Sequence, residues 1–287
     1  MNALARGPIA IRLGTRREIV GLVVGVILLI CAAVPLLFYV RPSVARAQIQ
    51  VIAHRGASAY APENTLAAFR VAIDQRADWL EVDVQQSSDG QLVVFHDLRV
   101  DDRTNGRGAV RDLTLAQLRE LDAGAKFRAE FAGERIPTFD EVVELARAHN
   151  VKLFPELKNP NLYPGIEERM VAALHAADYD NQTIVQSFST ESLRRVRELN
   201  PRLRLALLYS AQQPLRGDPP SWAYVLGPEW PLVVGDRAIL RDAHATGRQV
   251  VVWTVDNPSQ IRQAIEARVD GIITNRPDLV RNMLASH

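Results

Sequence analysis

The stretch VIAHRGASAYAPENTLAAFRVAIDQRADWLEVDV at residues 51–84 contains two short apolar runs separated by an amphipathic segment. The runs VIAH at 51–54 and WLEVDV at 79–84 predict β-strands, and the segment from Asn64 to Gln75 predicts an α-helix. A strand, a helix and a second strand in this order are typical of a parallel sheet whose strands are joined by helical crossovers.

The same alternation continues to the C-terminus. Further strands are predicted in the apolar runs at 91–95, 151–157, 183–188, 203–209, 224–226, 250–255 and 271–274. Further helices are predicted at 138–149, 165–177, 190–199, 238–246 and 258–267. The segment 48–287 has the length of one (β/α)8 barrel, which takes about 250 residues, so we predict an α/β fold of the TIM-barrel type.

Two features predict that this barrel is distorted. The runs at 79–84 and 91–95 are too close for a crossover helix, so they predict an antiparallel hairpin that turns at Ser88-Asp89-Gly90. The polar stretch at 98–137 interrupts the alternation and predicts a small inserted subdomain. Long insertions in compact domains are often functional, which favours a cover over an active site.

Composition and charge narrow the possible functions. Of the 287 residues, 47% are hydrophobic and 23% are charged, which is the usual balance of a folded domain. The 34 Lys and Arg against 33 Asp and Glu leave a net charge of +1, so electrostatics gives no reason to expect a nucleic-acid partner. The single cysteine excludes an intrachain disulfide and a thiolate zinc cluster.

The segment 19–40, IVGLVVGVILLICAAVPLLFYV, carries no charge. At 1.5 Å per residue it is long enough to cross the ~30 Å hydrocarbon core of a bilayer, so it predicts a single transmembrane anchor. The preceding segment 1–18 is rich in arginine, which predicts a cytoplasmic N-terminus and an extracytoplasmic domain at 48–287. The alternative is a signal peptide cleaved near Ala47, which would give a secreted or periplasmic protein.

Carboxylates follow a pattern that indicates an ion site. Glu81 and Asp83 lie two apart in WLEVDV, so both side chains point to the same face of the predicted strand. Glu156, near the end of the run at 151–157, converges with them if the strands line one barrel mouth. Three adjacent carboxylates need compensating charge, and hard oxygen ligands favour Mg²⁺ or Ca²⁺.

Two histidines and two cations complete this constellation. His54 and His96 each follow a short apolar strand, and together they form a candidate general acid and general base. Arg55 and Lys158 add fixed positive charge beside the ion, which suits a phosphate group. The residues therefore indicate phosphoester hydrolysis.

Other residues near these positions have two interpretations each. PENT at 62–65 forms either an ordinary helix start capped by Asn64, with Glu63 beside it, or a support for His54 and the ion. Trp253 either walls the pocket, which we favour, or fills the barrel core. Gln186 and Phe188 in VQSF either pack in the core, which we favour, or line the pocket.

Several short motifs occur in a fixed order between Val51 and Pro277. They are HRG at 54–56, PENT at 62–65, EVDV at 81–84, VFHD at 94–97, RTNG at 103–106, PELK at 155–158, QSF at 186–188, WTV at 253–255 and DGIITNRP at 270–277. In this combination the chain resembles the glycerophosphodiester phosphodiesterase family. The segment from Ser210 to Arg237 shows the resemblance least.

The resemblance implies a barrel with a subdomain inserted after the VFHD strand. It also implies metal-dependent hydrolysis of a glycerophosphodiester to glycerol 3-phosphate and an alcohol. The implied roles are acid/base catalysis by His54 and His96, one divalent cation held by Glu81, Asp83 and Glu156, and substrate binding by Arg55, Lys158 and Glu63. A cyclic phosphate intermediate and direct attack by water both remain open.

Two alternative functions follow from the predicted anchor. One is a lysophospholipase D-like hydrolysis of membrane lysophospholipids, for which the apolar segment 222–234 offers an approach. The other is a catalytically idle, membrane-tethered domain that binds glycerophosphate or lipid headgroups. The idle domain is expected to lack a histidine or a carboxylate of the constellation, and all of these are present.

Overall fold

The computed structural model describes residues 48–286. The predicted anchor at 19–40 and the alternative cleavage point near Ala47 lie outside the described residues. Among residues 48–286, every helix is too short or too polar to cross a bilayer.

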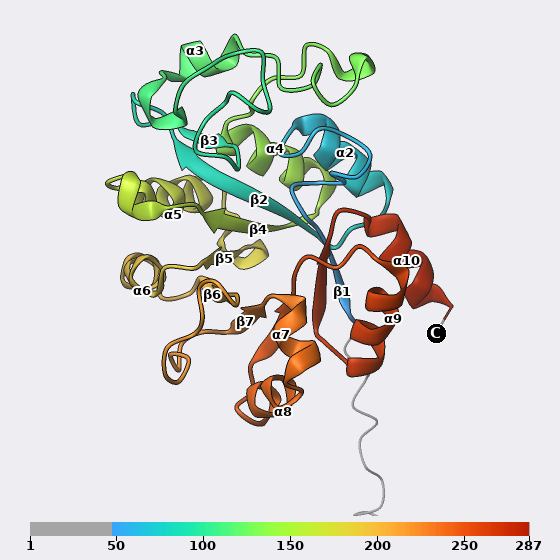
Figure 1. Cartoon of the computed structure of the whole chain (residues 1–287). Helices are drawn as coiled ribbons and strands as arrows, with labels where there is room; N and C mark the ends of the chain where they lie inside the picture. The colour runs from blue at the N-terminus through green and yellow to red at the C-terminus, as the bar shows by residue number, and fades with distance from the viewer. Residues whose placement is uncertain (1–47, 287) are drawn as a thin grey trace, which may run out of the picture. The chain divides into compact units, whose positions relative to one another are not determined.

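Parallel strands close into a barrel, as predicted (Figure 1). Around the barrel each strand pairs with the next, and β1 pairs with both β9 and β2 to close the ring. The eight barrel strands are β1 (Gln50–Ala53), β2 (Trp79–Gln86), β4 (Lys152–Leu157), β5 (Ile184–Ser187), β6 (Arg204–Tyr209), β7 (Val225–Pro228), β8 (Gln249–Val252) and β9 (Gly271–Thr274).

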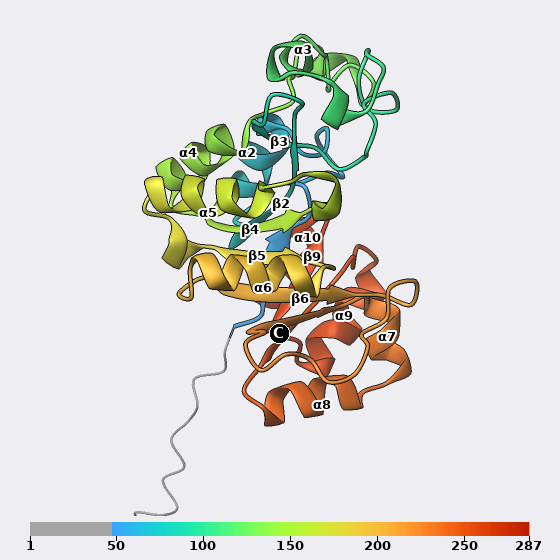
Figure 2. The same ribbon diagram turned by 90° about the vertical axis from the view of Figure 1, so that its left-hand side faces the viewer.

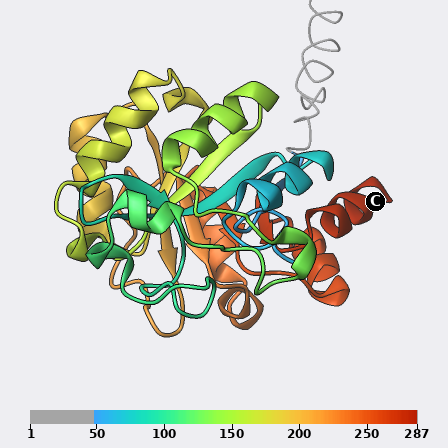
Figure 3. The ribbon, with the colours of Figure 1, turned by 90° about the horizontal axis from the view of Figure 1, so that it is seen from above.

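Helices surround this barrel on its outer side, as the view from above shows (Figure 3). In the side view, α5 and α6 lie next to each other over β4, β5 and β6 (Figure 2). The helices joined to barrel strands are α2 (Leu66–Asp74), α4 (Phe139–His149), α5 (Ile166–Ala176), α6 (Thr190–Leu199), α7 (Trp230–Gly235), α8 (Ala238–Ala245), α9 (Pro258–Ala267) and α10 (Pro277–Ala285). Single 3-10 turns occupy Pro160–Leu162 and Asp180–Gln182.

Strand alternation divides the core into two layers. Outward-facing residues such as Leu80 and Val82 join the helices in a large apolar cluster. Inward-facing residues fill the barrel with a smaller cluster of Ile52, Trp79, Phe154, Ile184, Ala206, Val225, Val251 and Ile273. Because side chains alternate along β2, Glu81 and Asp83 continue the inward row of Trp79 toward the carboxyl end of the barrel.

The predicted hairpin and insertion are both present. Strand β3 (Leu92–Val94) runs antiparallel to the end of β2, and Gly90 in the connecting turn has a φ of 82°, which glycine adopts without strain. The insertion that follows contains α3 (Leu115–Arg119) and 3-10 turns at Val110–Asp112 and Ala129–Phe131. Its own apolar cluster comprises Val93, Phe95, Val100, Val110, Leu118, Ala123 and Ile136.

The insertion lies above β2 and β3 at the top of Figure 1 and is tied to the barrel at several points. Its two ends meet where the Val94 amide donates to the Pro137 carbonyl oxygen over 2.9 Å. Arg128 stacks on Phe127 and Phe131 and donates to the carbonyl oxygen of Tyr60 in the β1–α2 loop. The insertion is therefore a compact unit fixed beside the carboxyl ends of the strands.

Some predicted elements differ from the structure. Neither α7 nor α10 was expected, and the apolar segment 222–234 proves to contain β7 and most of α7. The strand predicted at 250–255 ends at Val252, so Trp253 lies in the loop after β8. Asn64 does not cap α2: Thr65 is the N-cap, and its hydroxyl accepts from the Ala68 amide.

Candidate active site

A cavity opens at the carboxyl ends of the barrel strands. It brings together residues of β2, β4, β5, β6 and β9 and of the loops that follow β1, β3, β4, β5 and β8. The lining residues are His54, Arg55, Glu81, His96, Glu156, Lys158, Gln186, Phe188, Leu208, Trp253, Thr254 and Ile273.

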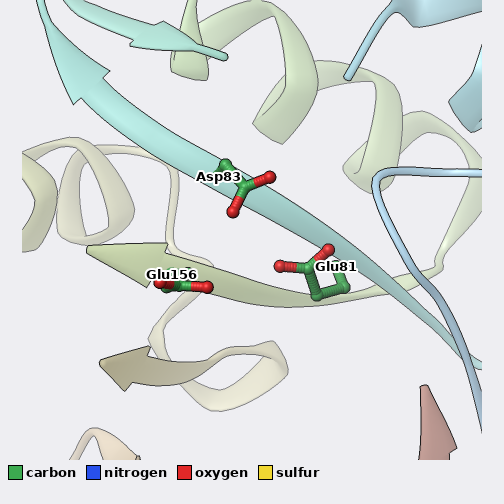
Figure 4. Close-up of side chains that lie close together, drawn as sticks. All are labelled: Glu81, Asp83 and Glu156. Atoms are coloured by element: carbon green, nitrogen blue, oxygen red, sulfur yellow. The ribbon is translucent and has the colours of Figure 1, made fainter. Parts of the chain in front are cut away.

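Three buried carboxylates meet beside this cavity (Figure 4). Glu81 and Asp83 project from β2, and Glu156 projects from β4, where it is the register partner of Asp83. One oxygen of each carboxylate lies within 4.8 Å of an oxygen of the other two. The predicted trio is therefore assembled by the alternation of β2 and the pairing of β2 with β4.

Two amide side chains hold these carboxylates in place. Asn64 Nδ2 donates to Asp83 Oδ2 over 2.8 Å, and Gln186 Nε2 donates to Glu81 Oε1 over 3.0 Å. Asn64 has a φ of 57°, a left-handed conformation that asparagine tolerates better than most residues. PENT at 62–65 thus supports the carboxylate trio as well as the start of α2.

The ionisation of the trio is uneven. Burial raises the pKa of Glu81 well above its usual range, and the charges of Asp83 and Glu156 raise it further. Burial also raises the pKa of Glu156 to about 7, although Lys158 opposes the change. Burial acts in the same direction on Asp83, but Lys158 and Arg55 outweigh it and lower the pKa of Asp83 to about 2.

These residues fit a divalent cation. Oxygen donors on neighbouring strands are the ligands that Mg²⁺ and Ca²⁺ prefer, and a cation would offset the repulsion that raises the pKa of Glu81. Gln186 supplies a further oxygen: its Oε1 is buried and accepts no hydrogen bond from the described part of the chain. The donor set does not discriminate between the two ions.

Arg55 and Lys158 place two positive charges against the trio. Arg55 Nε lies 3.2 Å from Asp83 Oδ2, and its backbone amide donates to Glu81 Oε2 over 2.8 Å. Lys158 Nζ lies 3.0 Å from Glu156 Oε1 and 3.7 Å from Asp83 Oδ1. Both cations line the cavity, so they are placed to meet an anionic group that enters it.

His54 follows β1, and residues at the end of β9 fix its ring and its backbone. Its Nδ1 lies 2.7 Å from Asn275 Oδ1, and its backbone amide donates to the Thr274 carbonyl oxygen over 2.8 Å. Burial and the neighbouring Arg55 lower the pKa of His54 to about 4, against the opposing charge of Asp83. The ring is therefore neutral at pH 7.

His96 follows β3, outside the barrel ring, and reaches the same cavity. Its Nδ1 lies 2.7 Å from Asp97 Oδ1, so its partner is a carboxylate rather than an amide. Burial lowers the pKa of His96, and the charge of Asp83 opposes this change. Gln85 on β2 positions the loop, because its Nε2 lies within 3.0 Å of the carbonyl oxygens of Phe95, His96 and Asp97.

An aromatic wall faces the charged groups. Trp253 packs edge-on against Phe188 with ring centroids 5.6 Å apart, and Trp253 Nε1 donates to the Gly227 carbonyl oxygen over 2.8 Å. Trp253 lines the cavity and also packs against the apolar cluster inside the barrel. Gln186 and Phe188 line the cavity as well, and Gln186 is buried, so for these residues a place in the core and a place on the cavity wall do not exclude each other.

Glu63 lies beside the cavity rather than on its wall. Its Oε1 accepts from Arg55 Nη1 over 3.0 Å and lies 3.7 Å from Arg103 Nε, which comes from the insertion. Arg103 Nε is also 3.4 Å from Asp97 Oδ2. Glu63 therefore acts on the cavity by holding Arg55. Arg103 connects Glu63, the partner of Arg55, with Asp97, the partner of His96.

Several polar residues around the site were not identified from the sequence. They are Gln85 on β2, Asp97 beside His96, Arg103 in the insertion, Asp256 after β8 and Asn275 after β9. A usable signal existed for Asp97 and Arg103, since both belong to the quoted motifs VFHD and RTNG. Asn275 likewise lies within DGIITNRP.

The fold and the site together define a class of protein. A (β/α)8 barrel that gathers carboxylates, two cations and two histidines at the carboxyl ends of its strands is typical of an enzyme that acts on a phosphorylated substrate. Residues 54–279 match the model of the glycerophosphoryl diester phosphodiesterase family. The chain belongs to this family of enzymes.

Related proteins and structures agree with this assignment. A glycerophosphodiester phosphodiesterase of Caldanaerobacter subterraneus is 41% identical over 237 residues, which make up 82% of this chain and 97% of that protein. A Bacillus subtilis glycerophosphodiester phosphodiesterase is 34% identical over 252 residues, which cover 81% of this chain and 85% of that protein. An Oleispira antarctica phosphodiesterase, solved with the product sn-glycerol 3-phosphate, has a TM-score of 0.73 at 29% identity and covers 83% of this chain and 97% of its own.

Proposed function

We propose that the chain hydrolyses glycerophosphodiesters to glycerol 3-phosphate and an alcohol, with His54 and His96 transferring protons and a divalent cation assisting. The observation that carries this proposal is the convergence of both histidines, Arg55 and Lys158 on one cavity beside the carboxylate trio. These groups come from separate strands and loops, and they supply the charge and the proton transfer that phosphoester cleavage requires.

Glu81, Asp83 and Glu156 are the residues proposed to hold the cation. Burial and neighbouring carboxylates raise the pKa values of Glu81 and Glu156, and a bound cation would offset the cost of ionising them, which supports this assignment. When bound, Mg²⁺ or Ca²⁺ supplies positive charge that stabilises the charge developing on the phosphate oxygens.

Arg55 and Lys158 bind and orient the phosphate in this proposal. Arg55 is held on two sides, by Glu63 and by Asp83, so its guanidinium presents a fixed direction to the cavity. Lys158 projects from the end of β4 beside Glu156. Fixed positive charges need no reorganisation as negative charge develops, which is the main advantage of a preorganised site.

The two histidines move the protons. One histidine removes a proton from the attacking oxygen through an unprotonated Nε2, and the other enters the reaction as an imidazolium and gives its Nε2 proton to the departing alcohol. Both rings have Nδ1 engaged by a partner, Asn275 for His54 and Asp97 for His96. In each ring, Nε2 is therefore the nitrogen left for the substrate.

The substrate class is tested with the purified full-length chain. Released glycerol 3-phosphate is measured from glycerophosphocholine, glycerophosphoethanolamine and glycerophosphoglycerol, and released choline is measured from lysophosphatidylcholine, each with and without a chelator. We expect release from the glycerophosphodiesters that stops on chelation and returns with added Mg²⁺ or Ca²⁺. Release that persists in chelator contradicts the role of the cation, and release from lysophosphatidylcholine alone contradicts the substrate class.

A further inference from the structure

Of the residues that hydrogen-bond to the Asn275 side chain within the described part of the chain, His54 is the one that lines the catalytic cavity. Strands β1 and β9 pair in register, with Ala53 opposite Thr274, so the residues that follow each strand emerge side by side. His54 Nδ1 lies 2.7 Å from Asn275 Oδ1, although 221 positions separate the two residues in the chain. Asn275 belongs to a neighbouring hollow and not to the cavity that holds the carboxylates.

Asp256 fixes which way the Asn275 amide faces. Asn275 Nδ2 donates to Asp256 Oδ2 over 2.5 Å, and the Asn275 backbone amide donates to Asp256 Oδ1 over 2.7 Å. The Thr274 hydroxyl also donates to Asp256 Oδ1, over 2.9 Å. A carboxylate only accepts hydrogen bonds, so the amide NH₂ must face Asp256 and the carbonyl oxygen must face His54.

The direction of this amide determines where His54 carries its proton. A carbonyl oxygen accepts but does not donate, so the hydrogen bond to Asn275 requires the proton on Nδ1. A neutral imidazole protonated on Nδ1 has its lone pair on Nε2. Ser58 Oγ lies 2.6 Å from Asn275 Oδ1 and 2.8 Å from the His54 carbonyl oxygen, and it can donate its single proton to one of them at a time.

We propose that Asn275, oriented by Asp256, is a positioning residue that fixes the tautomer and the ring orientation of His54, so that Nε2 exchanges the proton with the substrate. This inference rests on the proposed function, because it assumes that His54 transfers a proton. The two histidines then differ in their partners. His54 contacts the amide of Asn275, which Asp256 holds, whereas His96 contacts the carboxylate of Asp97 directly.

The first test is a double-mutant cycle in the full-length chain. We expect Asn275→Ala to lower kcat by about 10- to 100-fold, as the loss of a group that orients an active-site histidine does, and to leave KM within about twofold. In a His54→Ala background, Asn275→Ala should have no further effect, because a residue that acts through His54 has nothing left to position.

The matched control is Asn257→Ala. Asn257 lies in the adjacent loop and borders the same hollow, but its side chain caps α9 by accepting from the Ser259 amide over 2.9 Å. We expect it to lower the melting temperature without changing kcat. An Asn275→Ala effect that is equally large with and without His54 indicates a merely structural role and overturns the proposal.

Two results separate this inference from the proposed function. Full activity of His54→Ala removes His54 from the reaction and contradicts the proposed function itself. A large loss in His54→Ala together with normal kcat in folded Asn275→Ala overturns only the positioning role.

A measurement on the unmodified chain covers the case in which Asn275→Ala does not fold. The ¹⁵N chemical shifts of the His54 ring, recorded at pH 7, distinguish a protonated from an unprotonated nitrogen. We expect the proton on Nδ1, and a neutral ring with its proton on Nε2 overturns the proposal.

Discussion

Asn64 and Asp83 are joined by two reciprocal hydrogen bonds: Asn64 Nδ2 donates to Asp83 Oδ2 over 2.8 Å, and the Asp83 backbone amide donates to Asn64 Oδ1 over 3.2 Å. Both residues are buried. The pair links the start of α2 to the centre of β2, so the loop after β1, which carries His54 and Arg55, is fixed to the strand that carries two of the three carboxylates.

This link predicts the effect of Asn64→Ala. The substitution leaves a buried carboxylate and a buried amide without their partner, which costs about 1–3 kcal/mol of unfolding free energy. We also expect a higher Mg²⁺ or Ca²⁺ concentration for half-maximal activity, because Asp83 loses the group that orients it. The control is Asn150→Ala: Asn150 has a similar φ of 52° at the end of α4 but does not contact Asp83. An equal metal requirement in both variants contradicts the prediction.

Each histidine is predicted to be essential for turnover. His54→Ala or His96→Ala should lower kcat by ~10²–10⁴-fold, which is the usual contribution of general acid/base catalysis. The comparison is His149→Ala, since His149 is exposed at the end of α4. Thermal melts establish that each variant is folded. Near-normal turnover in a folded variant removes that histidine from the mechanism.

Asp83→Asn is predicted to weaken the ion site. The substitution removes the carboxylate with the lowest pKa of the trio, the one that Lys158 and Arg55 keep ionised. A titration of activity with Mg²⁺ and with Ca²⁺ should shift to higher concentration. If the titration coincides with that of the unmodified chain, the trio does not hold the ion.

The contribution of Glu156 to the stability of the chelated protein is predicted to fall as the pH rises from about 5 to 8, whereas His54, whose pKa burial lowers from 6.5 to about 4, acts in the opposite direction over the acid part of this range. Burial raises the pKa of Glu156 to about 7 from an ordinary value of 4.5, so the folded chain keeps a proton that the unfolded chain has released. Such a group stabilises the fold at low pH, and its contribution disappears as the pH rises through the folded-state pKa. Thermal melts in chelator at pH 5.5 and 8 measure the loss.

Two comparisons isolate the source of this pH effect. Glu156→Gln does not titrate at this position and keeps His54, so between pH 5.5 and 8 the melting temperature of the unmodified chain should fall relative to that of the variant. Added Mg²⁺ or Ca²⁺ should raise the melting temperature most at pH 8, since binding requires ionised ligands. The same pH dependence in the two chelated proteins contradicts the assignment to Glu156.

Arg103→Ala is predicted to affect activity more than stability. Arg103 is half-exposed, so its ion pairs with Asp97 and Glu63 contribute at most about 1 kcal/mol to folding. Its loss frees the partners of His96 and Arg55 together, and we expect kcat to fall about tenfold. Arg99→Ala is the control, because Arg99 in the same loop forms its ion pair with partly exposed Asp101 and, among the described residues, with neither Asp97 nor Glu63. Equal kcat in the two variants excludes the coupling.

The local pattern of the chain was enough to predict the barrel and the carboxylate trio. Alternation along WLEVDV is a property of any strand, so the inward direction of Glu81 and Asp83 follows once the strand is recognised. The two histidines and the two cations could also be predicted from the local pattern, because each of them follows an apolar run. Only the convergence of Glu156 with Glu81 and Asp83 required the further assumption that the strands line one barrel mouth, which the pairing of β2 with β4 satisfies.

The residues that the sequence did not identify depend on distant contacts. Asn275 meets His54 only because β9 pairs with β1 to close the barrel, and no pattern around either residue indicates that pairing. Gln186 lies in an apolar run and resembles a core residue until Glu81 is placed beside it. Asn64 and Thr65 have similar capping preferences, and the contact of Asn64 with Asp83 leaves Thr65 as the cap.

The closure of the insertion at its base bears on how this barrel can be modified. The chain leaves β3 and returns to α4 at adjacent points, joined by the Val94–Pro137 hydrogen bond, and the segment between them packs on its own apolar cluster. Because the two ends of the insertion lie next to each other, we expect that the insertion can be exchanged as a whole. We expect that exchange of residues 98–137 for the corresponding segment of a relative leaves the register of Glu81, Asp83 and Glu156 unchanged, so such chimaeras measure what the insertion, with Arg103, contributes beyond the barrel.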